Sequence, residues 1–242
     1  MASPVFILGG SQTDFARNWS REEATIFEIM KASVEGALES TQLTADQIDV
    51  AHVGNFVGEL FSRQGHLGGL FAAIDPAFHG LPTSRHEAAC ASGSVAILSA
   101  MTDLQAGHYH VACVSGVEQM RNVPGKLAAE YLGTAAWADR EALEAVFLWP
   151  WMFDALWKEY DKRYGIKREH LSAIAKLNFE NARTNPHAQT RAWTVNDANF
   201  GSCDENNPVV EGDIRRYDCS QITDGSVSVI LASEAFAQEY AH

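Results

Sequence analysis

Residues 86–94 read HEAACASGS, and they connect two segments of different character. The segment Ser84–Ala89 is predicted as a strand, although His86 and Glu87 are unusual inside one. The segment from Ser92 to about Gln105 is predicted as a helix, because small residues at its start are followed by an apolar run. Since this run is apolar nearly all round, we expect the helix to be buried. The stretch therefore indicates a strand followed directly by a buried helix.

Further strands and helices flank this stretch. Apolar runs predict strands at Val5–Leu8, Val50–Val57, Val111–Val117 and Val227–Leu231, and helical spacing predicts helices at about 23–38, 68–74 and 234–240. Gly54 interrupts the second strand, which predicts that another backbone approaches closely there. The alternation of strands and helices implies a layered α/β sheet with covering helices.

The alternation stops over residues 120–216, where the chain changes character. Helices are predicted there at about Ala145–Tyr164, which is rich in tryptophan, and at about Arg168–Arg183. Pro150 should either kink the first of these helices or mark its true start. We interpret this region as a mostly helical loop domain inserted into an α/β core, and the core is formed by residues 1–119 and 217–242.

Composition and charge limit the possible partners. The chain has 242 residues, of which 46% are hydrophobic and 20% charged, as in soluble globular proteins. A formal net charge of −13 would repel a polyanion, so we expect no nucleic-acid partner. No apolar run approaches the ~20 residues that span a bilayer, so we expect no membrane partner. The first residues lack the basic start of a signal peptide, which favours a cytoplasmic protein.

The chain contains four cysteines, Cys90, Cys113, Cys203 and Cys219. None is paired as Cys-x-x-Cys, and none lies beside a histidine cluster at zinc-like spacing, so we expect no metal site. Without a secretory signal, free thiols in a reducing compartment are the expected state.

Cys90 stands between the predicted strand and the predicted helix that follows it. The N-terminus of a helix carries a partial positive charge, which favours the thiolate form of a cysteine placed there. The small residues Ala91, Ser92 and Gly93 would let a thioester approach the backbone N–H groups closely. These features indicate an acyl-transfer nucleophile. A buried cysteine that merely fills space explains the position equally well.

Four segments resemble motifs of the thiolase family, in the order in which that family carries them. Residues 86–94 resemble the nucleophile motif, and Ser115–Met120 resembles the segment that closes the next core strand. Ile222–Ser226 resembles the signature that opens the last strand of the N-terminal half. Ile230–Phe236 resembles the sterol-carrier-protein type of thiolase. The resemblance implies a thiolase-like layered fold, namely the N-terminal βαβαβαββ half with an inserted, mostly helical loop domain.

The resemblance also implies a reaction. Cys90 would take an acyl group from an acyl-CoA, and a second acyl-CoA, deprotonated at its α-carbon, would attack this thioester to give a 3-oxoacyl-CoA. Thiolytic cleavage runs these steps backwards. Coenzyme A thioesters would be the substrates, and the family needs no metal or tightly bound redox cofactor. Tyr160 would lie near the pantetheine, although a tyrosine on a helix surface is an equal explanation.

Other polar residues have two explanations each. Asn55 and Arg63 lie where the family builds its subunit contact, but an exposed polar loop would also account for them. His86 and Glu87 could form a catalytic acid/base pair, although structural partners or interface residues are commoner beside a nucleophile in this layout.

The second-half motifs of the family, Asn-Glu-Ala-Phe, Gly-His-Pro and Cys-x-Gly, do not occur in the chain. We therefore expect the C-terminal thiolase half to be absent, and Cys90 to lack its histidine base. The predicted function is thiolase-type acyl transfer that is inactive in this chain alone. The alternatives are a non-catalytic acyl-CoA-binding or dimerising half-module, a subunit of a split thiolase, and a decarboxylating ketoacyl synthase. Half of the fold would leave apolar surface uncovered, so we expect a homodimer, a higher oligomer or a separate C-terminal half as partner.

Overall fold

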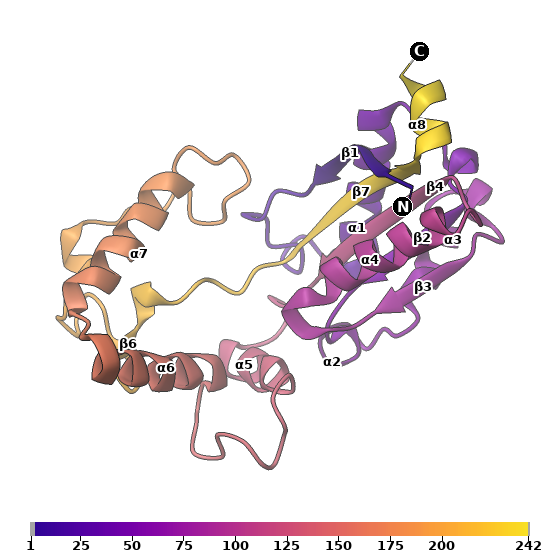
Figure 1. The fold of residues 1–242 in the computed structure, drawn as a ribbon. Helices are drawn as coiled ribbons and strands as arrows, with labels where there is room; N and C mark the ends of the chain where they lie inside the picture. The colour runs from indigo at the N-terminus through magenta and orange to yellow at the C-terminus, as the bar shows by residue number, and fades with distance from the viewer. Residues whose placement is uncertain (1–2, 242) are drawn as a thin grey trace. The chain divides into compact units, whose positions relative to one another are not determined.

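The computed structural model describes residues 3–241. The chain forms two compact units. The first comprises the chain up to Thr13, Asn18–Asn122 and the chain from Asp224 onward, and the second comprises Asp14–Arg17 and Val123–Thr223. The first unit contains the large sheet, and the second is mainly helical (Figure 1). The inserted domain is predicted at residues 120–216, and the corresponding segment of the second unit is Val123–Thr223.

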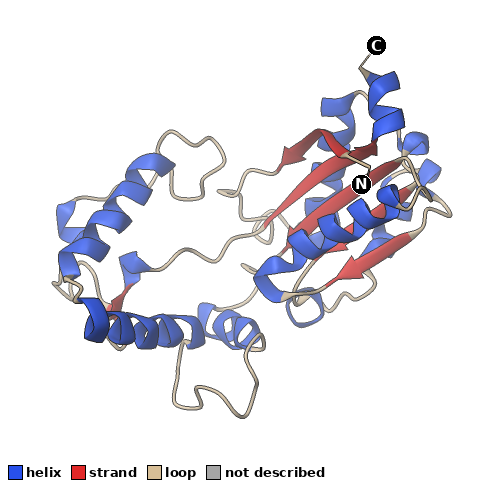
Figure 2. Cartoon of the chain, in the orientation of Figure 1, coloured by secondary structure: helices blue, strands red, loops and turns tan. Residues whose placement is uncertain are grey.

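The first unit is built on a five-stranded sheet (Figure 2). Its strands are β1 (Val5–Gln12), β2 (Val50–Gly54), β3 (Thr83–His86), β4 (Val111–Glu118) and β7 (Gly225–Ser233), in the spatial order β1-β7-β4-β2-β3. β2 runs parallel to β3 and β4, whereas β7 runs antiparallel to β1 and β4. The carboxyl ends of β2, β3 and β4 therefore meet at one edge of the sheet, and Cys90 follows β3 at that edge.

Two helices cover opposite faces of this sheet (Figure 1). α1 (Ile26–Thr41) begins at a capping box formed by Thr25 and Glu28, and it buries an apolar stripe against one face. α4 (Ser92–Gln105) packs small residues against the other face. The shorter helices of this unit are α2 (Gly58–Ser62), α3 (Phe71–Ile74) and α8 (Glu234–Tyr240).

The predicted order of strands and helices in the core is confirmed, but several details differ, and β1 continues to Gln12 rather than ending at Leu8. β2 ends at Gly54 rather than at Val57, and β3 ends at His86 rather than at Ala89, because the chain leaves the sheet there for loops at its carboxyl edge. α4 is not buried all round as predicted. Leu98 is 59% exposed because α4 has the sheet on one side and no further layer of the first unit on the other.

A buried cluster of four serines joins α1 to the middle of the sheet. Ser33 Oγ lies 2.6 Å from Ser226 Oγ and 2.7 Å from Ser228 Oγ, and Ser228 Oγ donates to Ser115 Oγ at 3.0 Å. Each hydroxyl has a partner inside the cluster, so its burial leaves no unsatisfied polar group. The cluster links residues from both ends of the chain.

The second unit consists mainly of three helices and a two-stranded sheet. These elements are α5 (Gly125–Gly133), α6 (Leu148–Tyr164), α7 (Arg168–Ala182), β5 (Val209–Glu211) and β6 (Ile214–Arg215). Pro150 lies in the first turn of α6, where a proline is tolerated, so it marks the start of this helix and does not kink it. Neither α5 nor the β5–β6 pair is among the predicted elements. No helix in the described chain is long and apolar enough to cross a membrane.

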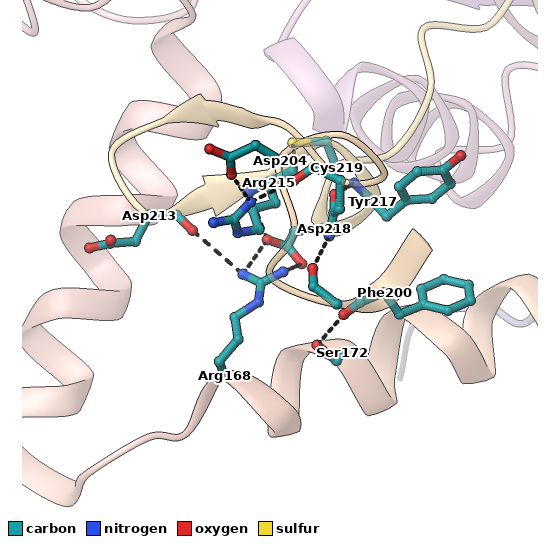
Figure 3. Close-up of polar contacts among 11 residues, drawn as sticks. Arg168, Ser172, Phe200, Asp204, Asp213, Arg215, Tyr217, Asp218 and Cys219 are labelled. Atoms are coloured by element: carbon teal, nitrogen blue, oxygen red, sulfur yellow. Dashed lines mark hydrogen bonds and ion pairs between the residues drawn. The ribbon is translucent and has the colours of Figure 1, made fainter. Parts of the chain in front are cut away.

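Charged pairs fix the second unit around α7 and the β5–β6 pair (Figure 3). Arg168, at the start of α7, donates from Nη1 to Asp218 Oδ2 at 2.7 Å and from Nη2 to Asp218 Oδ1 at 2.6 Å. Arg215, on β6, donates to Asp204 at 2.6 Å. Close ring contacts in this unit join Phe179, Phe200 and Tyr217.

Candidate active site

Cys90 lies in a short 3-10 helix, Ala89–Ala91, between β3 and α4, and its side chain is exposed. Ala89 has a φ of +48°, in a region that residues other than glycine seldom adopt. Ser92 stabilises this turn, because its Oγ accepts from the N–H of Ala88 at 3.0 Å and donates to the carbonyl of Ala89 at 2.6 Å. An exposed thiol on a strained turn that its neighbours hold in place is the arrangement found at many reactive sites.

The backbone around Cys90 offers a place for a developing negative charge. Within residues 3–241, the N–H of Cys90 has no hydrogen-bond acceptor. The neighbouring N–H of Ala89 is occupied, because it donates to Glu87 Oε1 at 2.5 Å. A free N–H beside the first turn of a helix favours an anion or the oxygen of a polarised carbonyl. The space-filling explanation for Cys90 is therefore wrong, since the thiol is not buried.

Gly54 brings the end of β2 against the start of α4. A Cβ placed on Gly54 would lie 2.7 Å from both the N and the Cα of Gly93. Contacts as short as this do not occur between real atoms, so only glycine fits here. The predicted close approach at Gly54 is confirmed, and it fixes the position of the helix that follows Cys90.

A polar network lies between α4 and the strands β2 and β3. His52 Nδ1 lies 2.9 Å from His86 Nε2 and 3.0 Å from Ser84 Oγ, and His52 Nε2 lies 3.1 Å from Asp103 Oδ2. His86 Nδ1 faces Ser99 Oγ at 3.4 Å. Both nitrogens of His86 are thus engaged, and neither is bonded to Cys90. This arrangement favours the structural explanation for His86 over acid/base catalysis.

Burial lowers the pKa of both imidazoles in this network. Burial is the largest effect on the pKa of His52, Asp103 raises that pKa, and the neighbouring His86 lowers it further. The pKa of His86 is also lowered by burial, again against the effect of Asp103. His52 is not among the residues predicted at the site, and its signal in the sequence is a histidine inside the apolar run that forms β2.

Glu118, at the end of β4, is a second ionisable residue that the sequence analysis does not single out. Its Oε1 accepts from the N–H of Phe56 at 2.5 Å. Burial raises the pKa of its carboxyl to about 7, although that hydrogen bond and the charge of Arg85 act in the opposite direction. The available signal was an acidic residue at the end of a mostly apolar run.

The three residues predicted at a subunit contact occupy different environments. Asn55 is 1% exposed, donates to the carbonyl of Val117 at 2.8 Å and accepts from the N–H of Gly58 at 2.9 Å, so the exposed-loop explanation is wrong for it. Arg63 is exposed at the end of α2. Glu87 is exposed and holds the Cys90 turn through the bond described above. Their role at a subunit contact stays a prediction.

Tyr160 lies on α6 in the second unit and is 51% exposed, with its ring centroid 5.0 Å from that of Tyr164. Two of the other three thiols differ from Cys90 in being buried or partly buried. Burial raises the pKa of Cys113 to about 12 and that of Cys219 to about 11, whereas Cys203 is exposed. In the part of the chain that the structure describes, no three His, Cys, Asp or Glu side chains are placed to hold a metal ion.

The amino-acid sequence matches a known family model and curated relatives. The model described as thiolase, N-terminal domain, matches residues 5–195. The chain is 31% identical over 240 residues to the acetyl-CoA acetyltransferase of Methanothermobacter thermautotrophicus, which covers 98% of this chain and 58% of that protein. It is 25% identical over 244 residues to sterol carrier protein 2 of Homo sapiens, covering 98% of this chain and 42% of that protein. The chain thus spans about half the length of these curated relatives.

Solved structures share the fold. Human mitochondrial 3-ketoacyl-CoA thiolase in complex with CoA is similar with a TM-score of 0.73 at 16% identity, covering 99% of this chain and 67% of that chain. The Ltp2-ChsH2(DUF35) aldolase is similar with a TM-score of 0.72 at 18% identity, covering 97% of this chain and 57% of that chain. These similarities confirm the thiolase-like α/β fold. Together with the family model matched over residues 5–195, they show that the chain belongs to the thiolase family through that family's N-terminal domain.

Proposed function

We propose that this chain supplies the acyl-carrying nucleophile of a thiolase-type acyltransferase that acts on coenzyme A thioesters. The proposed nucleophile is Cys90, and the observation that carries the proposal is the geometry of its turn. The thiol is exposed, its backbone N–H has no acceptor among the described residues, and α4 begins two residues later. The acetyl-CoA acetyltransferase among the relatives supports the choice of substrate.

The first step transfers the acyl group to the protein. The Cys90 thiolate attacks the carbonyl carbon of the thioester, and the bond between that carbon and the coenzyme A sulfur breaks. Coenzyme A leaves as a thiolate and takes up a proton, while the acyl group stays on Cys90 Sγ. Negative charge develops on the carbonyl oxygen during this step, and the free N–H of Cys90 is the donor that would stabilise it.

The second step forms or breaks a carbon–carbon bond. The α-carbanion of another acyl-CoA attacks the acyl carbon on Cys90, and the Cys90 thiolate leaves, giving a 3-oxoacyl-CoA. Thiolysis is the reverse. Proton removal from the α-carbon needs a base, and neither His52 nor His86 is bonded to Cys90. We infer that full turnover needs groups that residues 3–241 do not place beside Cys90.

Association with a partner belongs to the same proposal. Ile97 and Leu98, in the second turn of α4, present exposed apolar surface, which favours burial by a second copy or by a separate C-terminal half. Asn55, Arg63 and Glu87 would lie at a subunit contact, where the buried Asn55 would act by holding the loop after β2 through its bonds to Val117 and Gly58. Tyr160 would contact the pantetheine. A cytoplasmic location fits the four free cysteines.

Acyl transfer to the thiol tests the proposal directly. The purified chain is incubated with acetyl-CoA, and its intact mass and tryptic peptides are measured. We expect one acetyl group on the peptide that contains Cys90, none on a Cys90→Ser variant, and no 3-oxoacyl-CoA from the chain alone. Acetylation of Cys203 to the same extent as Cys90, or none anywhere, would contradict the nucleophile role.

A non-catalytic half-module is the second candidate, because Cys90 has no imidazole partner in the described chain. Such a module would bind acyl-CoA or dimerise without forming a covalent bond. Calorimetric titration with a non-hydrolysable acyl-CoA thioether separates the two functions. Binding of this analogue together with a complete lack of Cys90 acetylation would favour the half-module.

A further inference from the structure

The histidine pair, His52 and His86, connects the two segments on either side of Cys90. His86 is the last residue of β3, and the Cys90 turn follows it directly. Asp103 and Ser99, which face the pair, lie on α4, which begins directly after that turn. The pair therefore joins the strand that leads into Cys90 with the helix that leads out of it.

The hydrogen bond within the pair depends on its protonation. His52 Nδ1 and His86 Nε2 lie 2.9 Å apart, so one nitrogen must donate and the other must accept. The pair can hold one extra proton by moving a hydrogen between ring nitrogens, and Asp103, 3.1 Å from His52 Nε2, would stabilise that charge. With a second extra proton both imidazoles are positively charged, and His52 Nδ1 and His86 Nε2 both carry a hydrogen, so neither can accept. The hydrogen bond then breaks.

The surroundings offer little compensation for two positive charges. His52 lies on β2 and is 4% exposed. The groups that face the pair are the hydroxyl of Ser84 on β3, and Ser99 and Asp103 on α4. Among the described residues, Asp103 is the one charged group that faces the histidine pair. The charged residues on either side of His86 in the sequence have other partners. Arg85 is paired with Glu59, and Glu87 accepts from the N–H of Ala89.

We propose that the histidine pair positions the Cys90 turn, holding the end of β3 to α4 while the pair is intact and releasing it when both imidazoles are protonated. His52 and His86 are positioning residues, since they act through the backbone on either side of Cys90. The inference rests on the proposed function only in that Cys90 is the reactive thiol. The network itself is independent of any substrate.

The test measures alkylation of Cys90 by iodoacetamide between about pH 5 and pH 8, the range in which histidines titrate. The variants are His52→Asn and His86→Gln, which keep a polar atom near the lost ring nitrogen. His79→Gln, at an exposed histidine outside the network, is the matched control. Cys203, exposed in the second unit, reports in the same samples on a thiol without such a network.

In the natural chain, the alkylation rate at Cys90 divided by that at Cys203 should fall as pH drops below about 6.5, because protonation of both imidazoles breaks the pair. In His52→Asn and His86→Gln, this ratio should not change with pH and should be roughly tenfold lower at pH 7, as expected for a mispositioned group. His79→Gln should match the natural chain.

A ratio of Cys90 to Cys203 rates that stays constant with pH in the natural chain would overturn the proposal without recourse to any variant. Cys90 rates in both folded histidine variants equal to those of His79→Gln would overturn it as well. Alkylation needs neither coenzyme A nor turnover. If the ratio of Cys90 to Cys203 rates falls at low pH but Cys90 is never acetylated by acetyl-CoA, the positioning role stands and the proposed function fails.

Discussion

Gly54 and Gly93 meet backbone to backbone, with a Cβ on Gly54 only 2.7 Å from the N and Cα of Gly93. The relationship is asymmetric, because a Cβ on Gly93 would meet no atom within 4 Å. We expect Gly54→Ala to push α4 away from β2, with a loss of roughly 1–3 kcal/mol in the free energy of unfolding. Gly93→Ala should change stability by less than about 1 kcal/mol. Urea denaturation of both variants measures this, and equal losses would contradict the contact.

The four thiols should react at different rates with iodoacetamide near neutral pH. Cys90 and Cys203 are both exposed, yet only Cys90 lies directly before a long helix, so we expect it to react at least roughly tenfold faster. Burial raises the pKa of Cys113 to about 12, so this thiol should react only after unfolding. Peptide mass spectrometry over time gives the four rates. Equal rates at Cys90 and Cys203 would weaken the enzymatic function.

Glu118 should make stability depend on pH. Burial raises the pKa of its carboxyl from 4.5 to about 7, so between these values the folded chain binds more protons than the unfolded chain. The contribution of Glu118 to the free energy of unfolding therefore falls as pH rises through this range, by at most roughly 3 kcal/mol. Glu118→Gln should gain stability relative to the natural chain as pH rises from about 4.5 to 7.

His52 and His86 also make the free energy of unfolding depend on pH, in the opposite direction, because their pKa values are lowered. Both proteins contain these histidines, so their contribution cancels when the free energy of unfolding of Glu118→Gln is compared with that of the natural chain. Their contribution to stability is lost as pH falls below about 6.5. Glu39→Gln, at an exposed position of α1, is the matched control. A stability difference for Glu118→Gln that stays constant across this range would show that Glu118 is ionised throughout.

The second unit should depend on Arg168. Arg168 is 17% and Asp218 is 8% exposed, so Arg168→Met leaves a buried carboxylate without its partner and should cost roughly 3–5 kcal/mol. Arg163 forms an exposed pair with Glu159, and Arg163→Met should cost less than about 0.5 kcal/mol. Tryptophan fluorescence follows this unfolding, because five of the six tryptophans lie in the second unit. Similar losses in both variants would mean that the buried pair contributes no more than a surface pair.

Regular elements could be predicted where sequence spacing and capping agree. α8 has the predicted bounds, Glu234–Tyr240, and the Oγ of Ser233 accepts from the N–H of Phe236 at its start. α5 could not be predicted in the same way, since it follows Pro124 and starts at Gly125, both of which are typical of loops. The predicted end of β3 is wrong because Ala88 and Ala89 are small and apolar and carry no turn residue that would mark where the strand stops. The positive φ of Ala89 depends on the Ser92 bonds, which spacing alone does not reveal.

The environment of Cys90 could be predicted only in part. Its place between a strand and a helix follows from local sequence, and so does the close approach at Gly54. The contact between His52 and His86 spans 34 positions and requires the parallel register that sets His52 opposite Ser84. A shift of one residue would turn His52 to the other face of the sheet, and no single-sequence pattern determines that register.

β7 occupies the second position in the sheet although it is the last of the described strands in sequence, and β1 pairs with no other strand among the described residues (Figure 1). During synthesis on a ribosome, β1 therefore emerges before the other strands of this sheet and stays without a sheet partner until residues 225–233 have been translated. The hydrogen bonds of the Ser33 hydroxyl with Ser226 and Ser228 also cannot form before those residues have been translated. Pairing across so long a separation is slow, so the nascent chain completes the helical second unit before its first strand is secured.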